Sequence, residues 1–230
     1  MKTYVVAASR PGYEEMTRRL GEARGARFVL IEHREDFTAE ALEKLAPEMV
    51  FLPHWSFIIP AGIHENFPCV IFHMTDLPYG RGGSPLQNLI VRGHTETRLS
   101  ALRCVEDLDA GPIYLKRDLS LAGSAREIFA RGAALVEEMI REIIATRPEP
   151  VPQKGEAVVF KRRTPEQSNL AGITDPQKIH DHIRMLDADG YPHAFLEQDG
   201  VRYEFTASEL VAGQVRARVR IVPPRKESDS

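Results

Sequence analysis

The chain has little cysteine and no long apolar run. Only two of its 230 residues are cysteines, Cys69 and Cys104, and they form neither a CxxC pair nor a zinc-ligand spacing. We therefore expect free thiols and a cytoplasmic protein. No apolar run approaches the ~18 residues of a membrane-spanning helix, and the apolar stretch near the N-terminus is too short for the core of a signal peptide.

The chain also lacks an excess of charge of one sign. Its 30 Lys and Arg residues are balanced by 33 Asp and Glu residues, which gives a net charge of −3. Binding to nucleic acid would need a local basic patch, so we do not expect nucleic acid as a partner. The 16 Gly and 16 Pro residues are scattered, which excludes collagen-like and low-complexity chains.

Apolar runs alternate with helical segments over the first 120 residues. The runs are apolar on both faces and are separated by helical segments at 13–24 and 38–45, the second with Thr38 as its N-cap. Such runs are typical of a parallel sheet that is covered on both sides. We therefore predict an α/β fold, a doubly wound Rossmann-like domain whose first strands lie at residues 4–8, 27–31, 49–52 and 69–72.

The pattern changes near residue 150. Two strand-like pieces at 98–105 and 112–119 precede a helix over 124–146 with a wide apolar stripe. A Pro-rich segment, 147–152, predicts a stiff linker. We expect a catalytic domain at 1–152 and a small α+β accessory domain at 153–230, with a strand at 157–160, a helix at 175–186, antiparallel strands at 194–197, 201–205 and 215–222, and a frayed tail at 223–230.

One loop carries the clearest chemical signal. Ligands of open α/β sheets bind beyond the carboxyl ends of the strands, which here favours the loops at 53–61, 73–85 and 106–111. The second loop begins with His73 at the end of an apolar strand and continues into a Gly-rich stretch. A lone histidine is more often structural, but this position favours a functional one. The loop has neither GxGxxG nor GK[ST], so a phosphate cradle is weakly supported.

This loop resembles a known family signature. His73, Leu77-Pro78 and Arg81 to Pro85 resemble the HxxxLPxxRGxxP motif of N10-formyltetrahydrofolate-dependent formyltransferases, which include methionyl-tRNA formyltransferase, glycinamide ribonucleotide formyltransferase and amino-sugar N-formyltransferases. Residues 108–113 resemble LDTGDI, a motif in which the Asp is catalytic. Segments 160–166 and 183–186 resemble stretches that follow the catalytic domain in transformylases.

The resemblance implies formyl transfer from N10-formyltetrahydrofolate to a primary amine. By this analogy His73 and Asp109 are catalytic: the imidazole stabilises the developing oxyanion and relays a proton, and the carboxylate orients the imidazole. The alternative for Asp109 is a turn residue before Gly111, a position where Asp is common.

The chain departs from the family at one position. The family carries Asn-x-His, and the Asn helps to bind the oxyanion, whereas this sequence has Ile71 two residues before His73. Gln87 and Asn88, which follow the Gly-rich loop, are our catalytic candidates for a replacement donor, although solvent-facing or loop-capping amides are equally compatible. A different solution in this subfamily and a degenerate relative stay open as well.

The resemblance also implies binding residues. The cofactor residues would be Trp55, Phe57, Ile58, Ile59, Arg81, Gly82, Val105, Glu106, Asp107 and Leu108, with the pterin in the slot between the 55–59 loop and the 105–108 turn. Plain core packing is the alternative for the apolar members. The substrate residues would be Arg10, Thr75, Tyr79, Lys161, Arg162 and Arg163, although a basic run such as 161–163 is more often a solvated face. The histidine spacing supports no metal site.

The finer resemblance is to formyltransferases of bacterial surface-sugar pathways. Segments 53–60 and 72–90 look most like the pseudaminic-acid type, which formylates a UDP-linked 4-amino-4,6-dideoxy sugar. We therefore expect a nucleotide-linked amino sugar as the acceptor, and the resemblance is compatible with a homodimer. The alternatives are another amine acceptor, such as methionyl-tRNA, and a catalytically dead protein that binds folate or a nucleotide.

Overall fold

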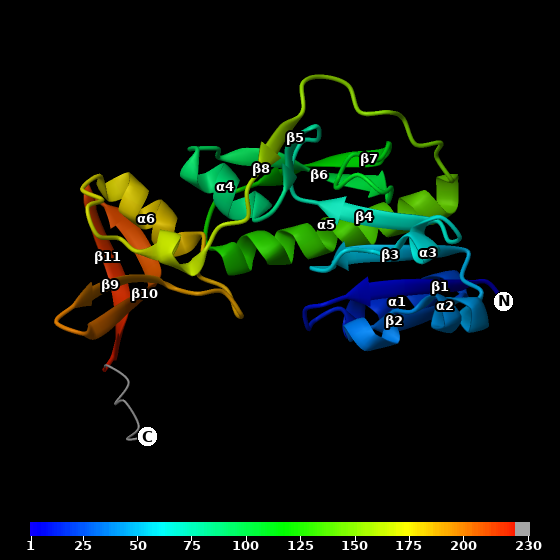
Figure 1. Cartoon of the computed structure of the whole chain (residues 1–230), viewed down its shortest axis with the longest axis horizontal. Helices are drawn as coiled ribbons and strands as arrows, with labels where there is room; N and C mark the ends of the chain where they lie inside the picture. The colour runs from blue at the N-terminus through cyan, green and yellow to red at the C-terminus, as the bar shows by residue number, and fades with distance from the viewer. Residues whose placement is uncertain (224–230) are drawn as a thin grey trace. The chain divides into compact units, whose positions relative to one another are not determined.

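The computed structural model describes residues 1–223, which divide into two compact units (Figure 1). The first unit comprises Met1–Gly82, Thr97–Leu119 and Arg131–Val159. The second comprises Gly83–Glu96, Ser120–Ala130 and the described part of Phe160–Ser230. Residues 153–159 thus group with the first unit, and the second unit draws on two internal segments besides the C-terminal one. Of the tail expected at 223–230, residues 224–230 lie outside the described residues.

The first unit is built on a six-stranded sheet with strand order β2-β1-β3-β4-β6-β7. β1 pairs in parallel with β2 and β3, and β3 pairs in parallel with β4, so the predicted α/β fold is confirmed. The strands are β1 (Thr3–Ala8), β2 (Arg27–Ile31), β3 (Met49–His54), β4 (Cys69–His73), β6 (Glu96–Arg103) and β7 (Ile113–Ser120).

One strand pair differs from the all-parallel expectation. β6 runs antiparallel to β4, with His73 opposite Ser100. Two neighbouring parallel strands need a crossover connection that packs on the sheet. The helix between β4 and β6, α4 (Pro85–Val91), belongs to the second unit, so among residues 1–223 the first unit has no such crossover helix between these two strands.

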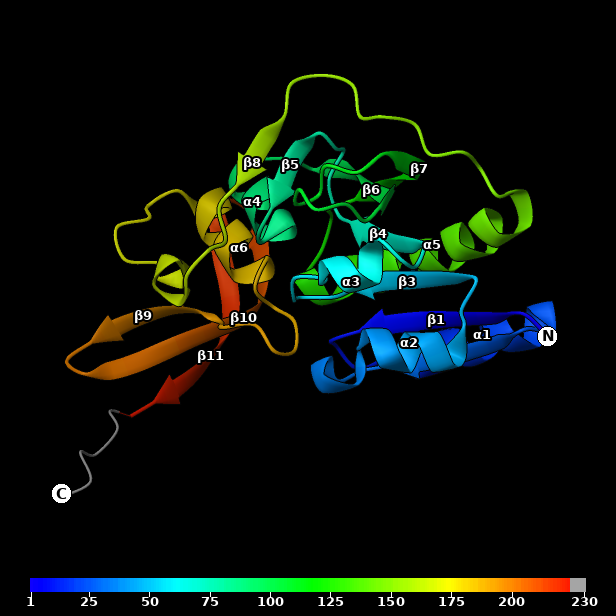
Figure 2. The ribbon, with the colours of Figure 1, turned by 45° about the vertical axis from the view of Figure 1, so that its right-hand side comes forward.

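Helices cover both faces of the sheet, as the doubly wound prediction requires (Figures 1 and 2). One face packs against α1 (Glu14–Arg24) and the part of α5 (Ala125–Thr146) that belongs to the first unit. The opposite face packs against α2 (Ala39–Leu45) and the short α3 (Ala61–His64). The first core contains Phe51, Phe72, Met139, Ile140 and Ile143; the second contains Val50, Leu52, Leu42, Ile63 and Cys69.

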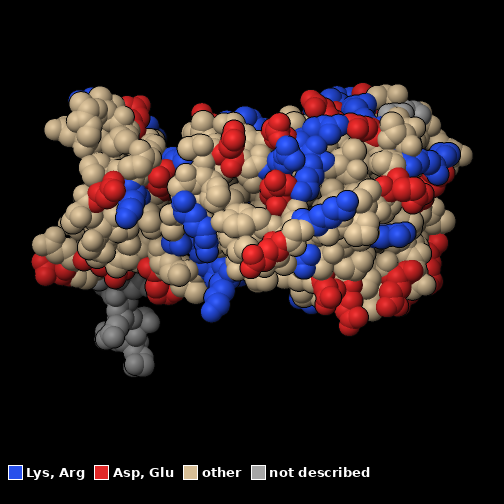
Figure 3. Space-filling model, turned by 90° about the horizontal axis from the view of Figure 1, so that it is seen from above, with Lys and Arg blue, Asp and Glu red and all other residues tan. Residues whose placement is uncertain are grey.

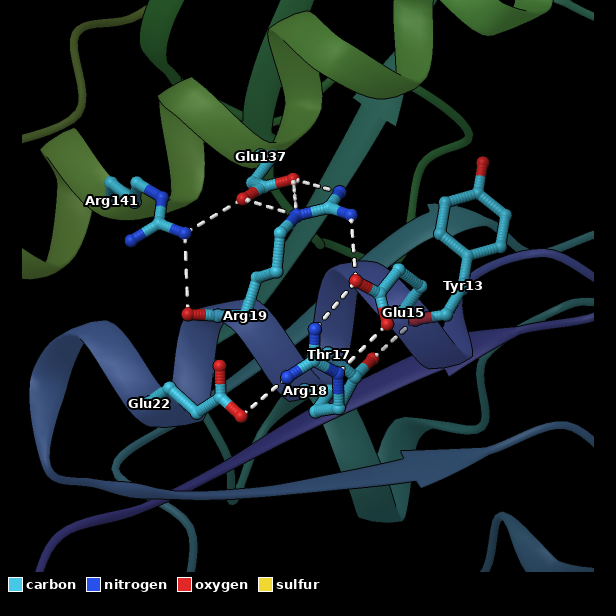
Figure 4. A network of polar contacts seen from close by, with 8 residues as sticks. All are labelled: Tyr13, Glu15, Thr17, Arg18, Arg19, Glu22, Glu137 and Arg141. Carbon is cyan, nitrogen blue, oxygen red and sulfur yellow. Dashed lines mark hydrogen bonds and ion pairs between the residues drawn. The ribbon is translucent and has the colours of Figure 1, made fainter.

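Charged side chains join α1 to α5 at the edge of the first core (Figure 4). The Arg19 Nη2 donates to Glu137 Oε2 at 2.6 Å, and Arg141 Nη2 donates to Glu137 Oε1 at 2.7 Å. The Glu137 carboxylate therefore receives two guanidinium groups, one from each helix. Its pKa is held below the usual range, chiefly by the hydrogen bond from Arg19.

The second unit contains a three-stranded antiparallel sheet of order β11-β10-β9. Its strands are β9 (Ala194–Gln198), β10 (Val201–Val211) and β11 (Gln214–Val222). β10 continues past its predicted end at residue 205, because an irregularity between Thr206 and Glu209 lets pairing with β11 resume. α6 (Pro176–Arg184) begins, as predicted, at Asp175, whose side chain accepts hydrogen bonds from the backbone N–H groups of Gln177 and Lys178.

Several local predictions are confirmed, and other features were not predicted. Thr38 caps α2 by accepting a hydrogen bond from the Ala41 N–H at 3.2 Å. Among the features that the sequence did not reveal are α3, β5 (Tyr79–Gly82) and the pairing of β5 with the predicted strand β8 (Val158–Phe160). Over residues 1–223, no helix has the length and apolarity that crossing a membrane would require.

Candidate active site

The imidazole of His73 lies at the carboxyl end of β4, with its two nitrogens in different surroundings. Nε2 lies 2.8 Å from the carbonyl oxygen of Gly80. A carbonyl oxygen can only accept, so Nε2 carries the proton and donates. The hydroxyl of Thr75 donates to the same carbonyl at 3.3 Å. Nδ1 is consequently the ring nitrogen whose lone pair can accept a proton.

Nδ1 of His73 faces a carboxylate. It lies 3.6 Å from Oδ2 of Asp109, and each of the two side chains is only 8% exposed. The same Oδ2 accepts the backbone N–H of Gly82 at 2.9 Å. Asp109 has a φ of +52°, a left-handed conformation that Asp tolerates better than most side chains. The structure therefore brings together His73 and Asp109, the predicted catalytic pair, and Gly82, a predicted cofactor residue.

The loop that carries Asp109 is held by a side chain that the sequence did not single out. Gln153 Nε2 donates to the carbonyl oxygens of Asp109 and Gly111, both at 2.8 Å. Gln153 Oε1 accepts from Arg81 Nε at 3.1 Å and from Arg81 Nη2 at 2.7 Å. No local pattern could have shown this role, because it depends on the pairing of Val151 with Ile113.

Gly111 brings its loop against the end of β6. A Cβ atom at Gly111 would lie 1.8 Å from the carbonyl oxygen of Arg103. Only glycine therefore fits between these two backbone segments. This close approach explains the glycine at position 111, which does not have a positive φ.

A cavity of about 520 Å³ lies beside the predicted folate slot. It includes Val105 and Glu106 from the predicted cofactor set, and its lining consists of His64, Glu65, Asn66, Phe67, Pro68, Arg103, Cys104, Val105 and Glu106. In the two predicted folate segments, Ile58 is 79% exposed and Leu108 is 59% exposed. Asp107 is exposed as well. Exposed apolar side chains of this kind are suited to the walls of a site for a flat heterocycle.

The rest of the predicted cofactor loop is partly packed. Trp55 is half-buried, with its ring 4.8 Å from that of Phe37 and 5.5 Å from that of Phe57. Its indole nitrogen is buried, and the described residues offer it no hydrogen-bond acceptor. Ile59 packs against the second core.

Ile71 contributes only apolar surface. It pairs with Leu52 of β3 and Leu102 of β6 and packs against the second core, to which Cys69 and Cys104 belong. Burial raises the pKa of the Cys69 thiol to about 12 and that of Cys104 to about 11. Both thiols are therefore neutral near pH 7.

The amides of Gln87 and Asn88 are engaged elsewhere. Gln87 Nε2 donates to the carbonyl of Met185 at 3.1 Å. Asn88 Nδ2 contacts the carbonyls of Gly83, Ser84 and Lys161 at 2.9–3.1 Å. These contacts within the second unit favour structural roles, so we leave both residues out of the proposed catalytic set.

The predicted substrate residues have varied surroundings. Lys161 and Arg162 are exposed; Arg163 is half-buried, its backbone N–H donating to Ser84 Oγ at 3.1 Å. Burial, and secondarily Arg92, lowers the pKa of Arg163. Thr75 is fully buried and Tyr79 is half-buried in β5, and Thr75 supports His73 through Gly80.

Arg10 lies near the carboxyl ends of β1 and β3. It contributes, after burial, to lowering the pKa of His54 to about 4, so the His54 imidazole is neutral near pH 7. The neighbouring hydroxyl of Ser9 donates to the carbonyl of His54 at 2.9 Å. Because Arg10 is cationic and the neighbouring His54 is neutral, this edge of the sheet favours the binding of an anionic group.

Acidic and basic side chains are interspersed on the face drawn in Figure 3. Residues 1–223 contain no group of three or more His, Cys, Asp or Glu side chains arranged to hold a metal ion.

Comparison with known proteins assigns both parts of the chain. The family model "Formyl transferase" matches residues 17–131, and the model "Methionyl-tRNA formyltransferase, C-terminal domain" matches residues 165–222. A curated methionyl-tRNA formyltransferase from Wolinella succinogenes is 26% identical over 172 residues, which is 72% of this chain and 55% of that protein. The chain thus spans about half the length of the curated relatives it matches.

Two solved structures show the range of similarity. The structure of a methionyl-tRNA formyltransferase from Clostridium thermocellum is 42% identical, covers 97% of this chain and all of its own, and gives a TM-score of 0.94. The formyltransferase PseJ from Anoxybacillus kamchatkensis, in complex with UDP-4,6-dideoxy-4-formamido-L-AltNAc and tetrahydrofolate, is 17% identical, with a TM-score of 0.61 over 76% of this chain and 94% of its own. The second likeness shows a shared fold alone.

Proposed function

Because the chain belongs to the formyl transferase family, we propose that it transfers a formyl group from N10-formyltetrahydrofolate to a primary amine. The observation that carries this proposal is the buried pair of His73 and Asp109, whose facing atoms are 3.6 Å apart. N10-formyltetrahydrofolate supplies the activated formyl group; the protein has to orient it, exclude water and move protons.

His73 is suited to the proton transfer. An amine that attacks a carbonyl carbon becomes cationic and must lose a proton. Nδ1 is the His73 nitrogen that can accept it, because Nε2 already donates to Gly80. Asp109 stabilises the resulting imidazolium, and its own position is fixed by the Gly82 N–H. The bond between the formyl carbon and N10 then breaks, and the proton held on Nδ1 can be returned to N10 as tetrahydrofolate leaves.

The residues beside the site fit the folate. The exposed apolar side chains of Ile58 and Leu108 and the neighbouring cavity offer walls for the pterin. The backbone of residues 105–108 offers donors and acceptors. Ile71 adds apolar surface at the position where the family motif has an oxyanion donor.

For the acceptor, we propose methionyl-tRNA rather than an amino sugar, which reverses the preference drawn from sequence. The relative with 42% identity over 97% of the chain carries that name, as does the model that matches residues 165–222. Polyanion binding needs a local concentration of basic residues. β11 presents Arg216 and Arg218 as exposed neighbours on one face.

The experiment combines N10-formyltetrahydrofolate with the purified chain and one acceptor at a time: methionyl-tRNA, a UDP-linked 4-amino sugar and a dTDP-linked 4-amino sugar. Release of tetrahydrofolate is followed by absorbance, and the product is identified by a mass gain of one formyl group. Formylation of methionyl-tRNA is expected. Formylation of a sugar alone would retain the reaction class and overturn the acceptor.

A charge-reversal variant tests the acceptor separately. Arg216→Glu/Arg218→Glu should raise KM for methionyl-tRNA by about 10-fold or more, because each lost phosphate contact weakens electrostatic binding. Glu209→Gln, on the neighbouring strand opposite Arg216, is the matched control; it removes a negative charge and should not raise KM. An unchanged KM in the double variant would contradict this use of β11.

The sugar acceptor is kept as the second candidate because segments 53–60 and 72–90 resemble the sugar enzymes. A catalytically dead relative is excluded if turnover occurs with any acceptor and disappears in His73→Ala.

A further inference from the structure

Besides the Asp109 carboxylate, which accepts the Gly82 N–H, the side chain of Gln153 links the Asp109 loop to β5; Gln153 directly follows the Pro-rich segment 147–152. Gln153 makes four hydrogen bonds there: two from its amide nitrogen to the carbonyls of Asp109 and Gly111, and two to its amide oxygen from Arg81. The backbone pairing of Val151 with Ile113, with N···O distances of 2.8 and 2.9 Å in the two directions, sets this segment beside β7.

The orientation of the Gln153 amide is determined by its partners. Both carbonyls can only accept, and a guanidinium can only donate. The nitrogen must therefore face the Asp109 loop and the oxygen must face Arg81. All four bonds are satisfied only by a glutamine in this orientation, so a glutamate of the same size would lose both donors.

Asp109 needs such support for a physical reason. Its left-handed backbone, with a φ of +52°, is disfavoured for a residue with a Cβ. The carbonyl of Asp109 itself is one of the two that Gln153 binds. Gly111, on the other side of Ala110, is wedged against Arg103 and is bound by the same amide. Rotation of the Asp109 peptide would break the Gln153 bond and move the carboxylate relative to His73.

We propose that Gln153 is a positioning residue for the reaction: it holds the backbone of Asp109 so that its carboxylate faces Nδ1 of His73. Arg81 contributes to the same positioning, because its hydrogen bonds to the Gln153 amide oxygen orient that amide. The inference rests on the proposed formyl transfer for its kinetic readout, but it predicts a change at His73 that can be measured without any substrate.

The kinetic test compares Gln153→Glu and Gln153→Leu with Lys154→Ala, a control at the next residue, whose side chain is exposed. A misplacement of about 1 Å can cost about 100-fold in rate. We expect kcat to fall between about 10- and 100-fold in both Gln153 variants while KM for the formyl donor changes less than about threefold. Lys154→Ala should match the wild type.

The second readout is the ¹⁵N spectrum of the His73 ring in the substrate-free protein. Nδ1 should shift in both Gln153 variants, because the carboxylate that faces it moves, and should stay in place in Lys154→Ala. If the folded Gln153 variants had the same ring spectrum and the same kcat as the wild type, the proposal would be overturned. If the wild type transfers no formyl group to any acceptor, the proposed function fails, and the ring spectra still decide the role of Gln153.

Discussion

Nδ1 of His73 and Oδ2 of Asp109 lie 3.6 Å apart in a region where both side chains are almost completely buried. The distance is longer than a hydrogen bond, and each side chain has a second anchor: the carbonyl of Gly80 for His73, and the N–H of Gly82 for Asp109. Both anchors come from β5. The two catalytic candidates are thus fixed by one short strand that the sequence did not reveal.

Asp109→Asn should retain the fold and lose activity. Asn tolerates the left-handed backbone as well as Asp does, and its amide oxygen can still accept from Gly82. It cannot stabilise a cationic imidazole, so we expect kcat to fall by about 10³–10⁴-fold, as in other His-carboxylate pairs. Steady-state kinetics and circular dichroism measure both properties. Asp118→Asn, whose side chain is 90% exposed on β7, is the control, and activity of Asp109→Asn within twofold of the wild type would contradict the assignment.

Ile71→Asn tests whether the missing oxyanion donor matters. The new amide enters an apolar surface formed by Leu52, Leu102 and the second core, so we expect a loss of about 1–3 kcal/mol in the free energy of unfolding. A folded variant that turns over faster than the wild type would show that Ile71 marks a lost donor. A folded but slower variant would show that this chain uses a different arrangement, and Ile71→Val controls for packing.

Gly111→Ala should destabilise the first unit. The added methyl group would lie 1.8 Å from the Arg103 carbonyl, so the backbone of one loop must move. We expect a loss of about 2 kcal/mol or more in the free energy of unfolding, measured by urea denaturation. Gly62→Ala is the control, because a Cβ at Gly62 meets nothing within 4 Å. Equal stability of the two variants would contradict the close approach.

Glu137→Gln should weaken the contact between α1 and α5 in a pH-dependent way. The pKa of Glu137 is lowered in the folded state, chiefly by Arg19, so its contribution to stability is present above the unfolded value of 4.5 and is lost as the pH falls through the folded value. Because Arg19 is partly exposed, we expect a loss of only about 1 kcal/mol at pH 7.

That difference should shrink below pH 4.5, where the wild-type carboxylate becomes protonated. Urea denaturation at several pH values measures it, with the exposed neighbour Glu138→Gln as the control. A difference that is independent of pH would show that the charge of Glu137 does not stabilise the helix pair.

The sequence predicted the parts of the fold that depend on local patterns. The buried strands β1 to β4, the caps at Thr38 and Asp175 and the long helix α5 follow from apolar runs and capping residues that are close in the chain. The antiparallel direction of β6 was missed because strand direction depends on the path of the chain between strands.

The residues of the candidate site could be predicted where they belong to a short sequence motif. His73 and Asp109 follow from two short motifs. Gln153, in contrast, directly follows the segment 147–152 that we predicted to be a linker, and its partners lie 42 to 72 residues away in the sequence. Gln87 and Asn88 looked available as donors because the sequence does not show that their amides bond to carbonyls. Long-range hydrogen bonds of this kind produce no periodic pattern in the sequence, so sequence analysis cannot detect them.

The central claim is tested most directly by comparing His73→Ala with the wild type in a single-turnover reaction with N10-formyltetrahydrofolate and methionyl-tRNA. The account predicts formylated product from the wild type and none above background from His73→Ala, with tetrahydrofolate binding retained by both proteins. Equal product from the two proteins would contradict the role of His73, and no product from the wild type with any amine acceptor would contradict formyl transfer itself.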